Sequence, residues 1–252
     1  MAEARKPDVQ SFADQVERRL KGQEQQAFSA LMGCDAALVC LCAGILRALD
    51  RRSEHLERFV QQLALSLQGH EDNDPDLFAT RFLLHDLGLQ SDPGPYHIHS
   101  PQLESGTNLF LVDESAIASM AAAIAASTAY GKRPPSAQPE LLEQLKAVLP
   151  VWMLYYFRQY NIEMGTLLLR AMNYLRLSQD KAVEEGLAFV FAQQQPDGRF
   201  GFFAPEVSNL RSKGRDLNDL IDLYLPITVS CLWAIAEVTL EGFSLFSFPG
   251  TD

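Results

Sequence analysis

Apolar residues recur at helical spacing along nearly the whole chain, and the alternation that marks a strand is absent. Glycine and proline gather between the periodic segments, where they interrupt helices. The pattern predicts helices over residues 9–30, 34–50, 53–68, 76–88, 111–129, 139–158, 162–177, 179–195 and 217–240. Pro150 should kink or split its helix, and Pro226 should do the same or mark the true start of the last helix. The sequence therefore predicts an all-α protein.

Two kinds of helix alternate along the chain. Segments that begin at Asp76, Ile162 and Asp222 each place an acidic residue and then a threonine ahead of a long apolar stretch. More amphipathic helices lie between several of these segments. A helix that is apolar on all sides must be covered, whereas an amphipathic helix can face water. We therefore expect about five helical hairpins with an inner and an outer ring, closed where helix 9–30 pairs with helix 217–240.

One stretch, residues 184–203, combines the end of a helix with a tight turn and a returning aromatic residue. Its first half has apolar residues at helical spacing. The Pro-Asp-Gly sequence at 196–198 then stops the helix, because proline lacks an N–H and glycine readily adopts positive φ. We expect the aromatic ring of Phe200 to pack back on the helix that ends near Gln195.

This stretch resembles the QW motif of the α/α-toroid proteins, the terpene cyclases and protein prenyltransferase β subunits. The motif places a small residue, an aromatic, an aliphatic, a glutamine and a Gly-x-aromatic in this order, with Phe here in place of its usual Trp. Its positions are filled by Gly186, Phe189, Val190, Gln193, Gly198 and Phe200. The resemblance implies one α/α-toroid domain over residues 1–252 and a small apolar, isoprenoid-like substrate in a central cavity, in specialised metabolism. Some uncharacterised bacterial proteins of this size look similar, and that likeness brings no activity.

Composition and charge narrow the class of protein. Hydrophobic residues make up 47% of the 252 residues, enough for a substantial core, and the net charge is -11. Such acidity argues against nucleic acid as a partner, because Lys and Arg are needed to neutralise phosphates. The start of the chain has no apolar signal segment, and no apolar run reaches the roughly 20 residues that span a bilayer. We expect a cytoplasmic protein without a membrane span, whose four cysteines are reduced core residues.

In a ring of hairpins, the loops that precede the inner helices all emerge on one rim. Polar residues concentrate in those loops, and four of the five histidines fall between positions 70 and 99. We therefore expect a site on that rim, at the mouth of a central cavity. The candidate catalytic residues are Asp72, Asp74, His97 and His99. The candidate substrate-binding residues are Tyr96, Asp216, Asp219, Arg215, Tyr224 and Trp233.

The acidic candidates have two interpretations. The segment 72–76 weakly resembles the D-x-D-D motif with which class II terpene cyclases protonate a double bond, but Pro75 stands where an Asp is required. Asp216, Asp219 and Asp222 are three residues apart, which suits magnesium and diphosphate if they share one helix face. Acidic residues at a helix start also cap its N–H groups and interact with its dipole, so both sets can be structural.

The two candidate histidines also have two interpretations. His97 and His99 share one face of an extended segment, so they could bind a metal with Glu104 or Asp86, or could be a solvated pair. The zinc ligands of the prenyltransferases are not reproduced, so we assign no metal and leave the cofactor unknown.

Basic and aromatic residues complete the candidate set. Arg215 belongs to a basic cluster that could neutralise a phosphate or carboxylate, or could simply solvate a loop. Tyr224 and Trp233 could line an aromatic cavity that stabilises a carbocation, or could be ordinary core residues.

Two rival functions stand beside the enzyme implied by the QW-like stretch. His55, His85 and Asp86, with Asp113 as a last ligand, resemble the metal-binding set of the HD-type phosphohydrolases. The segment around His85 aligns equally well with the chain's own repeats, however. A non-catalytic toroid would instead use its ring as a scaffold for a partner protein. A deep apolar cavity with a polar mouth would favour the enzyme, and a ring filled by side chains would favour the scaffold.

Overall fold

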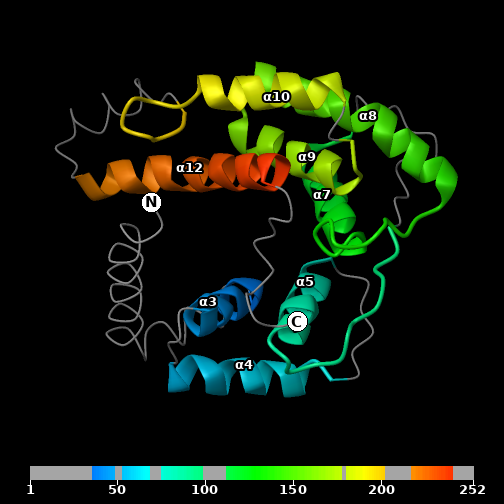
Figure 1. The fold of residues 1–252 in the computed structure, drawn as a ribbon, viewed down its shortest axis with the longest axis vertical. Helices are drawn as coiled ribbons and strands as arrows, with labels where there is room; N and C mark the ends of the chain where they lie inside the picture. The colour runs from blue at the N-terminus through cyan, green and yellow to red at the C-terminus, as the bar shows by residue number, and fades with distance from the viewer. Residues whose placement is uncertain are drawn as a thin grey trace. The chain divides into compact units, whose positions relative to one another are not determined.

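The computed structural model describes residues 36–48, 53–68, 75–98, 112–177, 180–201 and 217–240. Within these ranges the regular structure is helical (Figure 1), apart from one isolated antiparallel bridge between Gln194 and Phe200. The all-α prediction is therefore confirmed for the described part of the chain. The helix predicted at residues 9–30 lies outside the described residues.

The chain divides into two compact units, each of which is considered by itself. Unit 1 comprises Met1–Gly94 and Phe246–Asp252, and unit 2 comprises Pro95–Leu245. The helices of unit 1 are α3 (Ala36–Ala48), α4 (Glu54–Ser66) and α5 (Pro75–Asp86). The helices of unit 2 are α7 (Glu114–Ser127), α8 (Pro139–Arg158), α9 (Ile162–Tyr174), α10 (Lys181–Ala192) and α12 (Leu217–Thr239). All of them fall where hydrophobic periodicity predicts helices, while the closed single ring stays a prediction.

Neither internal proline splits its helix, contrary to one expectation from the sequence. Pro150 lies inside the continuous helix α8, and Pro226 lies inside α12, which begins nine residues earlier at Leu217. An internal proline costs a helix about 3 kcal/mol or more, through a lost hydrogen bond and a clash. Packing of both helices on α9 provides the compensating burial that local sequence rules do not count.

In unit 1 the guanidinium group of Arg47 links its own helix, α3, to two other segments. Arg47, in the last turn of α3, donates from Nε to Glu57 Oε1 of α4 (2.8 Å) and from Nη2 to Glu57 Oε2 (2.5 Å). Its Nη1 donates to the carbonyl of Leu87 just beyond α5 (2.8 Å). The hydrogen bonds from the Arg47 guanidinium to Glu57 raise the pKa of Arg47 above its ordinary value. Bidentate geometry makes this pair stronger than a typical surface ion pair.

In unit 2 the central element is α9, which packs against α7, α8, α10 and α12. Most of its residues are buried, including Arg170 and Thr166, as expected for a helix that is apolar on most sides. Thr166 is accommodated because its hydroxyl donates back to the carbonyl of Ile162 (2.8 Å). The expectation that neighbouring helices cover this segment therefore agrees with its burial.

Two glycines let helices α8, α9 and α10 approach closely around one aromatic ring. A Cβ atom added to Gly165 of α9 would lie well inside van der Waals contact with the ring of Phe157 in α8. A Cβ atom added to Gly186 of α10 would meet Met153 Cε at 3.0 Å and Phe157 Cε2 at 3.2 Å. The ring of Phe157 also stacks on Phe189 with centroids 4.8 Å apart. Gly186 thus has a packing role within the QW-like stretch.

Replacing Gly165 by alanine should lower the free energy of unfolding by about 1–3 kcal/mol, the usual cost of overpacking a core. The ring of Phe157 is fully buried, so any displacement of it disturbs packed neighbours. Gly186→Ala is the matched control, because the atoms nearest its new methyl belong to the flexible side chain of Met153. Urea unfolding of the two variants measures the difference. Equal stability of both would show that Phe157 does not fill the space beside Gly165.

The closure predicted after α10 is present. Phe200 is 1% exposed, and the Gln195 N–H donates to the carbonyl of Arg199 (2.7 Å) across a turn in which Gly198 has φ 89°. The backbone N–H of Phe200 also donates to the hydroxyl of Thr228 in α12 (3.1 Å). The expected burial of Phe200 is confirmed, and the turn ties α10 to α12.

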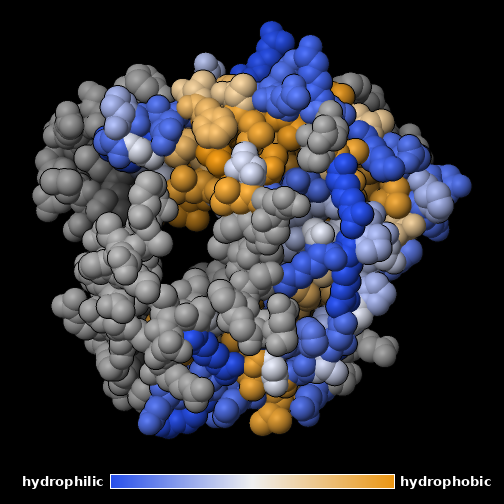
Figure 2. Space-filling view, viewed as in Figure 1, coloured by the Kyte–Doolittle hydropathy of each residue, from blue (hydrophilic) through white to orange (hydrophobic). Residues whose placement is uncertain are grey.

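One face of α12 carries a row of partly exposed apolar residues, and the helix expected to cover it, residues 9–30, lies outside the described residues. Leu225, Val229, Leu232 and Leu240 are each about half exposed. In space-filling view the region of α10 and α12 carries a broad hydrophobic surface (Figure 2). The spacing of four and three residues places Leu225, Val229 and Leu232 along one side of the helix. The described helices of unit 2 therefore cover α12 from the α9 side and leave this row accessible.

Candidate functional site

Several predicted site residues lie outside the described part of the chain. These are Asp72, Asp74, His99, Arg215 and Asp216. Asp219 belongs to the first turn of α12, and its side chain is likewise outside the description. Their convergence on one rim therefore stays a prediction.

His97 and Tyr96 lie on an irregular segment that is anchored to the loop before α8. The buried Ile98 donates its N–H to the carbonyl of Ser136 (2.9 Å), and His97 Nδ1 lies 3.1 Å from Ser136 Oγ. The imidazole of His97 is exposed and Tyr96 is half-buried against the core of unit 2. The segment thus presents His97 outward, beside a hydroxyl group.

Tyr224, a predicted substrate-binding residue, is buried and engaged with the closure after α10. Its hydroxyl lies 3.5 Å from Gln195 Nε2, and the guanidinium of Arg199 lies 4.5 Å from its ring centroid. Arg199 in turn pairs with Asp197 at 2.6 Å. One face of the Tyr224 ring therefore contacts a protein cation.

Trp233, the second predicted aromatic, belongs to a buried cluster between α9 and α12 that we call the Glu237 cluster. It consists of Arg170, Tyr174, Trp233 and Glu237. The carboxylate of Glu237 accepts from Arg170 Nε (2.8 Å), Trp233 Nε1 (2.8 Å) and the Tyr174 hydroxyl (2.6 Å). Arg170 also donates from Nη2 to Tyr174 (2.8 Å) and places its guanidinium carbon 3.4 Å from the centroid of the Trp233 ring.

The protonation states in the Glu237 cluster follow from its burial and charges. Burial raises the pKa of Tyr174 well above its ordinary value, so the phenol keeps its proton and acts as a donor. Burial alone would lower the pKa of Arg170, but Tyr174 and Glu237 together raise it, so the guanidinium stays charged. Each polar group thus has a partner within the cluster, and these contacts stabilise the packing of α9 on α12.

Sequence reasoning missed Arg170 and Glu237. The available signal was a charged residue within the apolar stretch of each of two helices, because such residues are rarely buried unless they are paired. Sequence spacing alone could not identify the pair, since the two residues are 67 positions apart.

Asp113 and His85, two members of the set that resembles HD-type metal ligands, make other contacts. Asp113 caps α7 by accepting from the Ala116 N–H (2.8 Å) and the Ser115 hydroxyl (2.7 Å). These hydrogen bonds, with the backbone bond first, lower the pKa of Asp113. His85 Nδ1 lies 3.3 Å from the carbonyl of Gln90. Among the described residues, no three His, Cys, Asp or Glu side chains are grouped to hold a metal ion.

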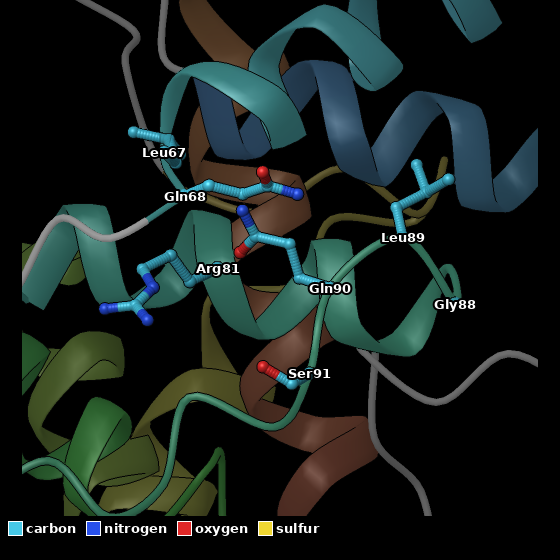
Figure 3. A pocket seen from close by; sticks show the side chains of 7 residues that line it. All are labelled: Leu67, Gln68, Arg81, Gly88, Leu89, Gln90 and Ser91. Atoms are coloured by element: carbon cyan, nitrogen blue, oxygen red, sulfur yellow. The ribbon is translucent and has the colours of Figure 1, made fainter.

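A pocket of about 300 Å³ lies in unit 1 (Figure 3). It is lined by Leu67 and Gln68 at the end of α4, by Arg81 of α5, and by the segment 88–91 that follows α5. The carboxamide of Gln90 is fixed by a hydrogen bond from its Nε2 to the carbonyl of Ala64 in α4 (2.7 Å). Figure 3 shows that carboxamide between Gln68 and Arg81, with the Ser91 hydroxyl on the other side of the space. The polar residues come from the end of α4, from within α5 and from the segment after α5.

Two further predictions can be compared with the described residues. Cys40 and Cys231 are buried thiols, and burial raises the pKa of Cys231 to about 12, which makes it chemically inert. None of the helices described is both long enough and apolar enough to cross a membrane.

In the part of the chain that the structure describes, the protein is helical, with a buried ionic cluster in unit 2 and a polar pocket in unit 1. Residues 2–234 match the model of a family described as a domain of unknown function (DUF6895), and the chain belongs to that family. No curated protein and no solved structure matches the chain.

Proposed function

We propose that the chain is a non-catalytic helical scaffold, built as an α/α toroid, that binds a partner protein. The observation that carries this proposal is the large buried hydrophobic cluster of unit 2. Large side chains from its helices and loops are fully buried against one another. They are Ile98, Ile124, Leu145, Leu149, Met153, Phe157, Leu168, Leu169, Met172 and Phe200. An enzyme that encloses an isoprenoid-sized substrate needs an apolar cavity lined by side chains of this kind.

The aromatic residues expected to contact a substrate also support a structural role. The indole N–H of Trp233 donates to Glu237, and one face of its ring is covered by Arg170. Tyr224 is buried beside Gln195 and Arg199. A ring that already contacts a protein cation on one face has less capacity to stabilise a substrate carbocation.

The half-exposed apolar row on α12 supports the closure of the ring by a further helix. Rows of this kind, with apolar residues four and three apart, are covered by a second helix in helical bundles. The sequence predicts that residues 9–30 provide that helix, with an apolar stripe of their own.

Native mass spectrometry of the protein isolated from the cells that produce it tests the proposal. We expect the chain to carry a protein partner and to release no stoichiometric small molecule on denaturation. Release of an isoprenoid-sized compound in one-to-one amount would instead support the terpene-cyclase-like or prenyltransferase-like enzyme. Isolation of the chain without any bound protein would count against the scaffold.

A further inference from the structure

Helix α8 has a second apolar face besides the one that it buries in the core of unit 2. Val151, Leu154 and Tyr155 are exposed large hydrophobic residues, and the small residue Ala147 is exposed one turn before them. Their spacing of three and four residues places all four on one side of the helix, and we call them the α8 row. The outward face of a surface helix is usually polar, so an apolar row of this kind indicates a contact surface.

Opposite charges stand at the two ends of the α8 row. The exposed Glu143 lies one turn before Ala147, and the exposed Arg158 lies one turn after Leu154. Glu143 Oε1 accepts from Lys146 Nζ at 2.7 Å, an exposed ion pair of the kind that contributes little to stability. A carboxylate has the capacity to accept further hydrogen bonds. The row is therefore bounded by a negative charge at its start and a positive charge at its end.

These residues are arranged symmetrically about Val151. Tyr155 and Ala147 each lie four positions from it, or about 6 Å along the helix axis. Arg158 and Glu143 lie seven and eight positions from it, or about 11–12 Å. A two-fold axis at Val151 that packs two copies of α8 antiparallel therefore sets Tyr155 level with Ala147 of the other copy. It also sets Arg158 level with Glu143 of the other copy, so that each large side chain faces a small one and each charge faces its opposite.

From this pattern we propose that a second copy of the chain covers the α8 row, in a symmetric dimer whose two α8 helices pack antiparallel. A parallel arrangement would bring the two Arg158 side chains together and the two Glu143 side chains together, which is unfavourable. Helix α8 carries two acidic and two basic residues, so this face lacks the excess negative charge of the whole chain, which is -11. The dimer does not depend on the proposed scaffold function, because it involves no other protein.

Sedimentation equilibrium of the purified full-length chain measures its association. We expect a reversible equilibrium between monomer and dimer, with a dissociation constant below about 100 μM, because one helix face forms a small interface. A chain that stays monomeric up to about 100 μM would overturn the dimer. Occupation of the α8 row by a different protein would have that outcome, since the purified chain would then have no partner.

A substitution at the centre of the α8 row identifies the surface that associates. Val151→Glu should weaken the dimer at least about hundredfold, because the two new carboxylates would meet at the two-fold axis. Glutamate is a good helix former and the position is exposed, so the fold should be kept, which circular dichroism checks. Leu65→Glu is the matched control, since Leu65 is an exposed aliphatic residue of α4. Dimers of equal strength in the two variants would place the interface elsewhere and contradict the proposal.

Exchange of the two charges tests the antiparallel register. Arg158→Glu should weaken the dimer at least about tenfold, because it sets like charges against Glu143 of the other copy, and Glu143→Arg should act in the same way. The double variant that carries both substitutions should dimerise to within about threefold of the original chain, because opposite charges again face each other. A double variant that associates no better than either single variant would show that the helices do not pair in this register.

Discussion

Replacing Glu237 by alanine is expected to lower the free energy of unfolding by about 3–5 kcal/mol, the cost of breaking a buried ion pair by removing one partner. The substitution leaves Arg170 charged in the contact between α9 and α12, without the carboxylate that accepts its Nε–H. It also removes the acceptor of the Tyr174 hydroxyl and the Trp233 indole. Urea denaturation followed by circular dichroism measures the loss.

Two comparisons make the test of the Glu237 cluster specific. Glu184→Ala removes an exposed glutamate of α10 and should change the stability by no more than about 0.5 kcal/mol. The double variant Arg170→Met with Glu237→Leu removes both charges, so it should recover most of the loss. If Glu237→Ala unfolds at the same urea concentration as Glu184→Ala, the cluster does not hold the two helices together.

Phe200→Ala is expected to destabilise the protein by about 3–5 kcal/mol, the range for deletion of a buried aromatic side chain. Phe200 is 1% exposed within the core of unit 2, next to the turn that joins α10 to α12. Phe191→Ala is the matched control, because Phe191 belongs to the same stretch but is 49% exposed. Thermal unfolding of the two variants gives the comparison. An unchanged melting temperature for Phe200→Ala would show that the closure does not contribute to the core.

Local chemistry accounts for the features that could be predicted from the sequence. The helix ranges follow from apolar periodicity, and the turn after α10 follows from Pro196 and from the positive φ that Gly198 adopts. The burial of Phe200 could be predicted because the turn returns the chain to the helix it has just left. In each case the interacting residues are within a few positions of one another.

Much less of the candidate site could be predicted from the sequence, because its contacts join distant residues. Tyr224 and Trp233 were correctly placed in a mostly apolar helix, but their partners Arg199 and Glu237 were not predicted. The pocket beside Arg81 was also missed, because its lining comes from the end of α4, from α5 and from the segment after α5, which meet only after folding. Residues chosen for their chemistry alone, such as His97, carried no information about which groups would lie beside them.

For the described residues, the sequence by itself determined which segments are helical, where they end to within about three residues and which faces are apolar, since these properties depend on interactions between near neighbours. Only the tertiary structure decided that Arg170 pairs with Glu237 and that Phe157 fills the space beside Gly165. It also decided that helix α8 continues through Pro150. Such features depend on contacts between distant segments, whose geometry sets the balance between burial, charge pairing and strain.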